Sequence, residues 1–383
     1  MKYRQFGKLD WKGSVLGLGA MRFPLIDGNP AHVNEEEAIN MIHYAIDNGV
    51  NYIDTGYFYH GGKSEYIVGK ALKGYYEGKA KVAVKMPVII VESASDFDRL
   101  FDEQLKRLDK SKMDFYMLHG LGATSWHKVR DLGIINWAEK KMAQGYFDHF
   151  GFSFHDEYVA FKEIIDSYDN WTFTQVLYNY MDVNRQAGMR GVKYAKAKNV
   201  AVTVMEPIRG GVLAKKPPEL VAKVWEGAPQ QMSFAEWALQ WVWNQPEISV
   251  VLSGMSTLEQ LQENIKSAER SGIGKLNEAD MALINRVREA YKNLYPIPCS
   301  GCRYCAECPN EVNISSIFEI YNDAVVYDIL TRGRYRYQDS LLNGHRADEC
   351  LECNKCVEAC PQKIDIPEWL KKIHEVLNTP KVW

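Results

Sequence analysis

The stretch NYIDTGYFYHG at residues 51–61 places two ionisable side chains directly behind a short β-rich run. Asp54 ends the run, and a carboxylate beside a buried strand is costly unless it is paired or takes part in chemistry. Tyr59 follows in the next loop. A phenol has a reference pKa of about 10, so it donates a proton poorly near neutral pH unless a cation lowers that pKa. The stretch therefore predicts a lysine supplied by another part of the chain.

Around this stretch, β-rich runs alternate with helical segments from residue 1 to about residue 275. The runs lie near 15–21, 51–55, 81–86, 114–118, 147–153, 173–179, 201–207 and 248–254, and the helical candidates near 35–48, 64–74, 95–108, 134–144, 156–167, 188–198, 233–244 and 257–268. Residues 5–15 predict a small hairpin before the first barrel strand. Eight β-then-α units fit a (β/α)8 TIM barrel, an α/β fold of roughly 250 residues. A doubly wound sheet is the alternative, but it would usually contain fewer units.

The last third of the chain has a different organisation. A further helix is expected from about 277 to 294, and prolines at 296 and 298 mark a domain boundary. We therefore expect a barrel at 1–275, a linking helix at 276–295 and a small, mainly helical domain at 296–383. That domain has helical stretches near 314–328 and 367–377.

The composition limits the partners and the location of the protein. A net charge of -3 gives no support to nucleic acid or an anionic membrane as a partner. No apolar run approaches the ~20 residues of a membrane helix, and the first residues contain no apolar segment typical of a signal peptide. We expect a cytoplasmic protein whose oligomeric state the sequence does not specify.

Two neighbouring strands provide the groups that Tyr59 needs. Lys85 follows the apolar run VAV, and His119 follows MDFYML. Singly, a strand-end Asp is usually a cap and a strand-end Lys usually reaches solvent. Jointly, these side chains should meet Asp54 at the C-terminal rim of a barrel. Lys85 would lower the pKa of Tyr59, and Asp54 would keep Lys85 charged. Tyr59 would then protonate a carbonyl oxygen as hydride reaches the carbon, while a neutral His119 orients that oxygen.

Three stretches, YIDTGYFYHGG, VAVK and MDFYMLHG, resemble the motifs around the catalytic tetrad of the aldo-keto reductases, and GFSFHD, TQVLYNYMD, VMEPIRGGVL and SGMSTLEQLQENI agree in order. The resemblance covers roughly residues 1–275 and implies an NAD(P)H-dependent carbonyl reductase. By matched position, Tyr59 is the acid, Lys85 and Asp54 are its partners, and His119 orients the carbonyl. Tyr57 lies closer to Asp54 and fits the motif less well.

The resemblance also implies contacts with a nicotinamide cofactor, NADPH or NADH. They would fall on Gly19, Ala20, Met21, Asp54, Ser153, Gln175, Glu206, Pro207, Gly211, Leu213, Gly254, Met255, Ser256, Gln260, Glu263 and Asn264. Phe154 replaces the asparagine that usually follows the serine, and Met205 replaces an aromatic residue that often stacks on the nicotinamide. Gly254 and Gln260 replace basic residues that grip a 2′-phosphate, which removes cations that would favour NADP.

All eight cysteines lie in the C-terminal region, in two blocks. The blocks are Cys299-x2-Cys302-x2-Cys305-x2-Cys308-Pro309 and Cys350-x2-Cys353-x2-Cys356-x3-Cys360-Pro361. The second block matches the ferredoxin-type run, in which three thiolates bind one [4Fe-4S] cluster and the fourth serves the other. The first block has one residue fewer before its last cysteine. This logic assigns one cluster to Cys299, Cys302, Cys305 and Cys360, and the other to Cys308, Cys350, Cys353 and Cys356.

Two zinc sites of four thiolates each are the alternative, with disulfides a weaker one, and the Cys-Pro endings favour clusters. The tail resembles the [4Fe-4S] dicluster extension found on a subset of aldo-keto reductases. Clusters move single electrons and a nicotinamide moves hydride, so joining them needs a mediator such as a flavin.

Three hypotheses follow for the whole chain. In the first, a reductase of a small-molecule carbonyl exchanges electrons through its clusters with ferredoxin or another electron carrier. In the second, the clusters are structural or sense redox state. In the third, a non-catalytic electron-transfer or redox-sensing protein binds a nucleotide in its barrel, although such a binder would not need a tuned phenol.

Overall fold

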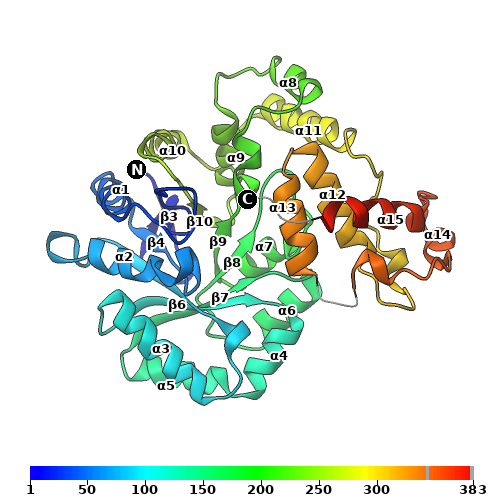
Figure 1. The fold of residues 1–383 in the computed structure, drawn as a ribbon. Coiled ribbons are helices and arrows are strands. Elements are labelled where there is room, and N and C mark those ends of the chain that lie inside the picture. Colours follow the sequence, from blue (N-terminus) through cyan, green and yellow to red (C-terminus); the bar gives the residue numbers. More distant parts are fainter. Residues whose placement is uncertain (342–344, 380–383) are drawn as a thin grey trace. The chain divides into compact units, whose positions relative to one another are not determined.

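Eight parallel strands close into a barrel in the computed structural model, which describes residues 1–341 and 345–379 (Figure 1). The order around the barrel is β10-β3-β4-β5-β6-β7-β8-β9. The strands are β3 (Leu16–Gly19), β4 (Tyr52–Asp54), β5 (Lys81–Met86), β6 (Met113–Leu121), β7 (Phe147–Phe154), β8 (Phe173–Leu177), β9 (Ala201–Met205) and β10 (Ile248–Ser253). The predicted (β/α)8 barrel is confirmed, and the doubly wound sheet is excluded.

Alternate residues along each strand face the barrel interior. Near the N-terminal ends these residues are apolar, and Tyr52 and Ala83 belong to one buried cluster there. Two residues further along the same strands lie Asp54 on β4 and Lys85 on β5. The alternation that builds the core therefore also delivers polar side chains to the C-terminal rim, where this fold carries its sites.

A hairpin closes the opposite end of the barrel. It consists of β1 (Tyr3–Gln5) and β2 (Lys12–Ser14), which pair antiparallel as predicted. Phe6, in the connecting loop, is fully buried, and its ring centroid lies 5.0 Å from that of Phe115 inside the barrel. Trp11 packs against the same cluster. Aromatic side chains therefore fill the N-terminal end of the barrel.

Helices follow the barrel strands at the predicted places. They are α1 (Glu35–Asp47), α2 (Ser64–Ala71), α3 (Ser95–Leu108), α4 (Ala123–Asp131), α5 (Ile134–Ala143), α6 (Tyr158–Asp166), α7 (Gly188–Ala197), α9 (Phe234–Trp243) and α10 (Leu258–Arg270). Only α4 in this set was not predicted. It buries just Trp126 and Val129, so its sequence shows little helical periodicity.

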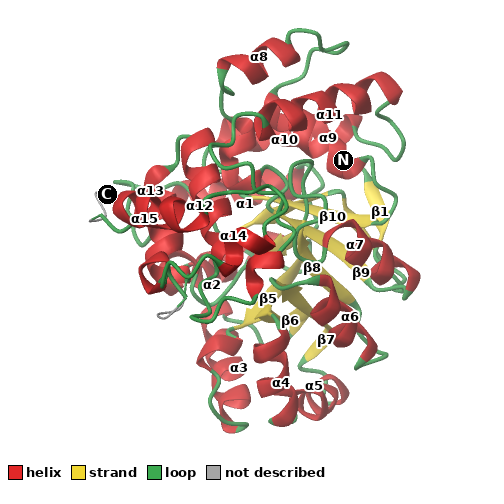
Figure 2. Cartoon of the chain, turned by 90° about the vertical axis from the view of Figure 1, so that its right-hand side faces the viewer, coloured by secondary structure: helices red, strands yellow, loops and turns green. Residues whose placement is uncertain are grey.

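A second compact unit comprises residues 216–231 and 278–383. Its helices are α8 (Glu219–Trp225), α11 (Glu278–Lys292), α12 (Ile314–Val326), α13 (Leu330–Tyr335), α14 (Lys355–Ala359) and α15 (Ile366–Leu377) (Figure 2). Its core contains Phe318 of α12 and Leu370 of α15, with Cys360 buried among them. The unit is mainly helical, as predicted, and six of the eight cysteines belong to its core or pack against it, while Cys302 and Cys353 are exposed.

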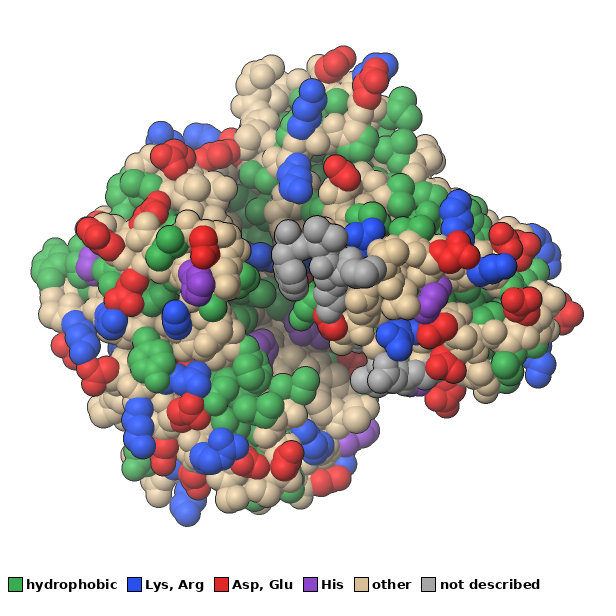
Figure 3. All heavy atoms as spheres, in the orientation of Figure 1, with side chains coloured by type: hydrophobic (Ala, Val, Ile, Leu, Met, Phe, Trp, Pro, Cys, Tyr) green, Lys and Arg blue, Asp and Glu red, His purple; other side chains and the backbone are tan. Residues whose placement is uncertain are grey.

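Two features of the structure bear on possible contacts with a membrane or with nucleic acid. None of the helices in the described part of the chain combines the length and the apolar character of a membrane span. On the face that Figure 3 shows, basic and acidic side chains are interspersed, so that face carries no stripe of one sign.

Candidate active site and cysteine sites

A buried ion pair lies at the C-terminal ends of β4 and β5. Lys85 Nζ is 2.5 Å from Asp54 Oδ1, and the two side chains are 1% and 5% exposed. The ammonium also donates a hydrogen bond to the carbonyl oxygen of Thr55 at 3.0 Å. Burial lowers the pKa of Lys85, but the charge of Asp54 and the hydrogen bonds with Asp54 and Tyr59 more than offset this, so the pKa lies above its ordinary value. Lys85 is therefore a cation fixed in the mouth of the barrel.

Tyr59 and His119 complete a group of four side chains. Lys85 Nζ lies 4.6 Å from the centroid of the Tyr59 ring. The ammonium acts on the phenol both as a charge and as a hydrogen-bond partner. The rings of Tyr59 and His119 are 5.9 Å apart and nearly perpendicular, at 85°. The structure therefore brings together the three residues predicted from strand ends and Tyr59, predicted from the loop after the first of them.

Burial gives Tyr59 a different pKa from the one that the sequence suggested. It raises the pKa of the phenol, and the charge of Lys85 lowers that pKa by less. Lys85 lowers the pKa of Tyr59, as expected, but burial raises it by more, so the pKa lies above its usual value and the expected net lowering is not found. The resting site holds Tyr59 protonated, and Lys85 limits the cost of losing that proton.

His119 is held in its neutral form. Burial is the main reason that its pKa falls to about 3, and the positive charge of Lys85 adds to the effect. A neutral imidazole can donate a hydrogen bond to a carbonyl oxygen without releasing a full proton. The same burial therefore yields a protonated phenol beside a neutral imidazole.

Ser153 and Gln175 stand opposite one another on β7 and β8, and they are 1% and 2% exposed. Ser153 Oγ accepts a hydrogen bond from the backbone N–H of Gly120 at 2.7 Å. The buried Oε1 of Gln175 has no hydrogen-bond partner among the residues that the structure describes. A buried acceptor without a donor is costly, so a ligand donor is expected there. The amide N–H of a nicotinamide carboxamide is a donor of the right kind.

The other predicted cofactor residues lie on three segments at the C-terminal rim. Gly19 ends β3 and Ala20 and Met21 follow it, Glu206, Pro207, Gly211 and Leu213 follow β9, and Gly254, Met255, Ser256, Gln260, Glu263 and Asn264 follow β10 or lie on α10. Hydrogen bonds within the segment after β10 hold it in place. Ser256 N donates to Gln260 Oε1 at 2.8 Å. Asn264 Nδ2 likewise donates to Ser253 Oγ at 3.0 Å.

A buried charge cluster that the sequence analysis missed ties two of the rim loops together. Arg209 donates to both carboxylate oxygens of Asp182, at 2.9 and 3.1 Å. Asn179 Nδ2 donates to Asp182 Oδ2 at 3.0 Å and to the carbonyl oxygen of Glu206 at 3.2 Å. The loop after β9 is thus held by the loop after β8. The available signal was the run of polar residues directly behind the strand in LYNYMDVN.

A second missed network supports the catalytic segments from behind. Arg107 of α3 donates to the carbonyl oxygen of Tyr57 at 3.0 Å and to Glu65 at 3.2 Å. Gln104 donates to the carbonyl oxygen of Lys85 at 3.0 Å. Helices α2 and α3 therefore fix the backbone of the strand that carries the lysine and of the loop that carries the tyrosine.

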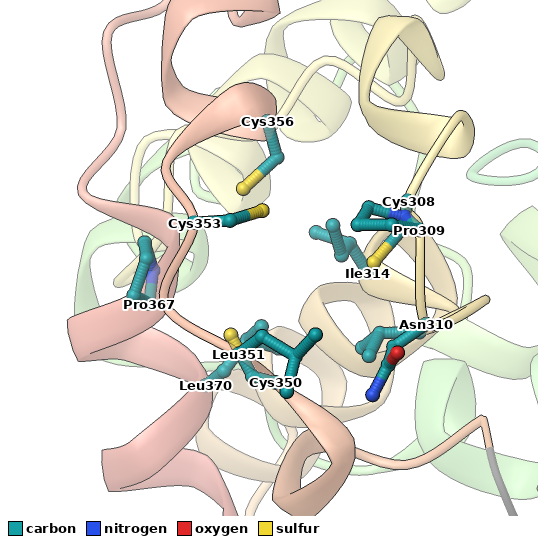
Figure 4. Close-up of a pocket in the computed structure, with 11 residues that line it drawn as sticks. Cys308, Pro309, Asn310, Ile314, Cys350, Leu351, Cys353, Cys356, Pro367 and Leu370 are labelled. Carbon is teal, nitrogen blue, oxygen red and sulfur yellow. The ribbon is translucent and has the colours of Figure 1, made fainter.

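The eight cysteines line two cavities in the second unit. Cavity A contains Cys299, Cys302, Cys305 and Cys360 and encloses about 330 Å³, including space open to solvent. Cavity B contains Cys308, Cys350, Cys353 and Cys356 and encloses about 360 Å³ on the same basis (Figure 4). Each cavity therefore collects three cysteines of one block and the last cysteine of the other.

The described residues contain no site already closed around a single metal ion. Zinc binds sulfur at about 2.3 Å, so its ligands must converge on one point. Within residues 1–341 and 345–379, no three Cys, His, Asp or Glu side chains converge in that way. Cys350 Sγ also accepts a hydrogen bond from Glu352 N at 3.4 Å, and such a bond favours a thiolate.

Comparisons with known proteins agree with this geometry. A model of the Aldo/keto reductase family matches residues 15–289, and a model of the 4Fe-4S dicluster domain matches residues 298–364. L-galactose dehydrogenase of Arabidopsis thaliana is 25% identical over 318 residues, which cover 77% of this chain and 96% of that protein. NADH-specific methylglyoxal reductase of Escherichia coli (strain K12) is 25% identical over 342 residues, which cover 76% and 99%. The holo structure of aldo-keto reductase AKR11C1 from Bacillus halodurans shares the fold, with a TM-score of 0.63, 24% identity and coverage of 75% and 96%.

The depressed pKa of His119 gives a prediction for its ring. With a pKa of about 3, the imidazole should stay neutral from pH 8 down to pH 5, where an ordinary histidine gains a proton. The measurement is NMR of 13C-labelled histidine across this range, with the His119 signal assigned from its absence in His119→Gln. A titration midpoint between pH 6 and 7 would contradict the burial that the structure shows.

Proposed function

The chain belongs to the aldo/keto reductase family, and from this membership we propose that its barrel interconverts a small aldehyde or ketone and the corresponding alcohol with a nicotinamide cofactor. The buried Lys85–Asp54 pair beside the Tyr59 phenol carries the proposal. A buried ion pair usually adds little stability to a fold. The position of this pair beside a partly exposed tyrosine therefore favours a catalytic role over a structural one.

Tyr59 is the proposed proton donor. In carbonyl reduction the carbon gains a hydride, which a bound nicotinamide supplies, and the oxygen gains a proton. The raised pKa keeps that proton on Tyr59 until charge develops on the carbonyl oxygen. Lys85 then stabilises the phenolate, and Asp54 keeps the ammonium charged and in place. Solvent returns the proton to Tyr59 after the reaction.

His119 is the proposed orienting group. Its ring stands close to perpendicular to that of Tyr59, so both can address one oxygen from different sides. A neutral ring donates a hydrogen bond to that oxygen and leaves proton transfer to Tyr59. The two residues then hold the carbonyl in one orientation, which lowers the barrier by fixing the geometry of attack.

Ser153 and Gln175 are the proposed contacts of the nicotinamide carboxamide. The support is the buried Gln175 Oε1, for which no donor is found among the described residues. The loop after β9, held by the Arg209–Asp182 pair, and the segment after β10 are the proposed contacts of the rest of the dinucleotide. The cofactor proposed is NADPH or NADH, because these contacts do not depend on a 2′-phosphate.

We further propose that cavities A and B each hold one [4Fe-4S] cluster. The support is the match to the dicluster domain and the grouping of the cysteines. The clusters would exchange single electrons with a carrier such as ferredoxin, and a two-electron mediator such as a flavin would link them to carbonyl chemistry. A purely non-catalytic role is disfavoured, because a nucleotide binder has no use for Tyr59 beside a buried cation.

Tyr59→Phe removes the proposed acid and leaves the shape of the site. We expect kcat to fall by at least about 10²-fold, with cofactor affinity nearly unchanged. The assay is anaerobic, with a panel of aldehydes and ketones and both NADH and NADPH, and cofactor binding is followed by fluorescence. Tyr57→Phe is the matched control, because the Tyr57 hydroxyl donates to Glu103 at 3.0 Å. Full activity of Tyr59→Phe, or an equal loss in both variants, would remove Tyr59 from the mechanism.

Protein purified without oxygen should be brown, absorb broadly in the visible range and bleach with dithionite. Two clusters of four irons predict about eight irons per chain. Cys302→Ala and Cys353→Ala should each lower this number by about half, because the two cysteines line different cavities. A colourless protein with stoichiometric zinc would refute the cluster assignment.

A further inference from the structure

Cavities A and B differ in the hydrogen bonds that reach their sulfur atoms. The Oγ of Ser315, in the first turn of α12, lies 3.8 Å from the Sγ of Cys305 in cavity A. A cysteine bound to iron carries no proton, so the hydroxyl must be the donor in the loaded protein. In the described part of cavity B, no side-chain hydroxyl reaches a sulfur.

Backbone donors do not remove this difference, because both cavities have them. In cavity A the N–H of Gly301 reaches Cys299. In cavity B the N–H of Glu352 lies 3.4 Å from Cys350 Sγ, and the N–H of Val357 reaches Cys356. The difference lies in the kind of donor, because Ser315 is a side-chain hydroxyl and the donors to the sulfurs in the described part of cavity B are backbone N–H groups.

The two linings also differ in charge. Both linings are mainly apolar, and that of cavity A includes Phe318 and Ile366, but it also contains the cationic residue Arg303 and the polar residues Ser300, Tyr304 and Gln362. Cavity B is lined mainly by apolar side chains such as Leu351 and Leu370, which Figure 4 shows around the four cysteines. Reduction makes a cluster more negative, so a nearby cation and hydroxyl dipole stabilise the reduced state, while apolar surroundings do not.

We infer that the cluster in cavity A has the higher reduction potential of the two, and that Ser315 is a tuning residue that raises it. This inference rests on the proposed pair of clusters. Ile314 lines both cavities, so the two cavities are neighbours. With both cavities loaded, one electron would pass from a reduced cluster held by Cys308, Cys350, Cys353 and Cys356 to an oxidised one held by Cys299, Cys302, Cys305 and Cys360, so that one site would lose the electron that the other gains. No proton moves and no bond is broken.

The test is a redox titration of the anaerobic, iron-replete full chain with dithionite, followed by electron paramagnetic resonance. The wild type should reduce in two steps. Ser315→Ala should move the first step to a more negative potential and leave the second in place. Ser315→Thr keeps a hydroxyl and should restore the first step. Ser300→Ala is the matched control, because Ser300 lines cavity A without a hydrogen bond to any sulfur in the described residues.

Iron content is measured first, so that a failure of the proposed pair of clusters can be told apart from a failure of the tuning role of Ser315. About four irons or fewer per wild-type chain would refute the proposed pair of clusters. With about eight irons, an unchanged first step in Ser315→Ala, a shift of the second step, or an equal shift in Ser300→Ala would overturn the tuning role. If Ser315→Ala fails to retain iron, the isosteric pair Ser315→Thr and Ser315→Val replaces it, and equal potentials in that pair refute the inference.

Discussion

The barrel site depends on one interaction, the contact between the Lys85 ammonium and the Asp54 carboxylate. Removing two charges from water costs several kcal/mol per ion, and only close geometry offsets this. The pair has that geometry, at 2.5 Å with almost no exposed surface. The strands bring Lys85 and Asp54 together, because β4 and β5 are paired neighbours that end at the same rim of the barrel. The fold thus holds a cation where an isolated lysine would lose its proton.

The same exclusion of water assigns the protonation states around this cation. Burial raises the pKa of Tyr59 and lowers that of His119 to about 3, so each ring is neutral and each can donate a hydrogen bond. Lys85 lowers the pKa of both rings, since its positive charge favours the phenolate of Tyr59 and disfavours the imidazolium of His119. In the second unit a hydroxyl makes the corresponding difference, because Ser315 reaches a cysteine sulfur of cavity A and no side-chain hydroxyl does so in the described part of cavity B.

Most of the fold could be predicted because its signals are local. Strand runs, helical periodicity and cysteine spacing can each be recognised in a short stretch of sequence. Asp54 and Lys85 could be predicted because each stands at the end of a β-rich run. The missed features depend on residues distant in sequence. Arg107 reaches Glu65, and Arg209 reaches Asp182, through contacts that only the closed barrel creates. The sign of the pKa shift of Tyr59 was missed for the same reason, because burial is a property of the assembled site.

The most direct test of the central claim is a double-mutant cycle on kcat with Lys85→Met and Tyr59→Phe. If Lys85 acts through the phenol, removing it from a protein that already lacks the phenol costs little more. The account therefore predicts that the double variant is about as slow as the slower single variant, with cofactor binding showing that each variant is folded. Losses in activation free energy that simply add would contradict it, because Lys85 and Tyr59 would then act independently.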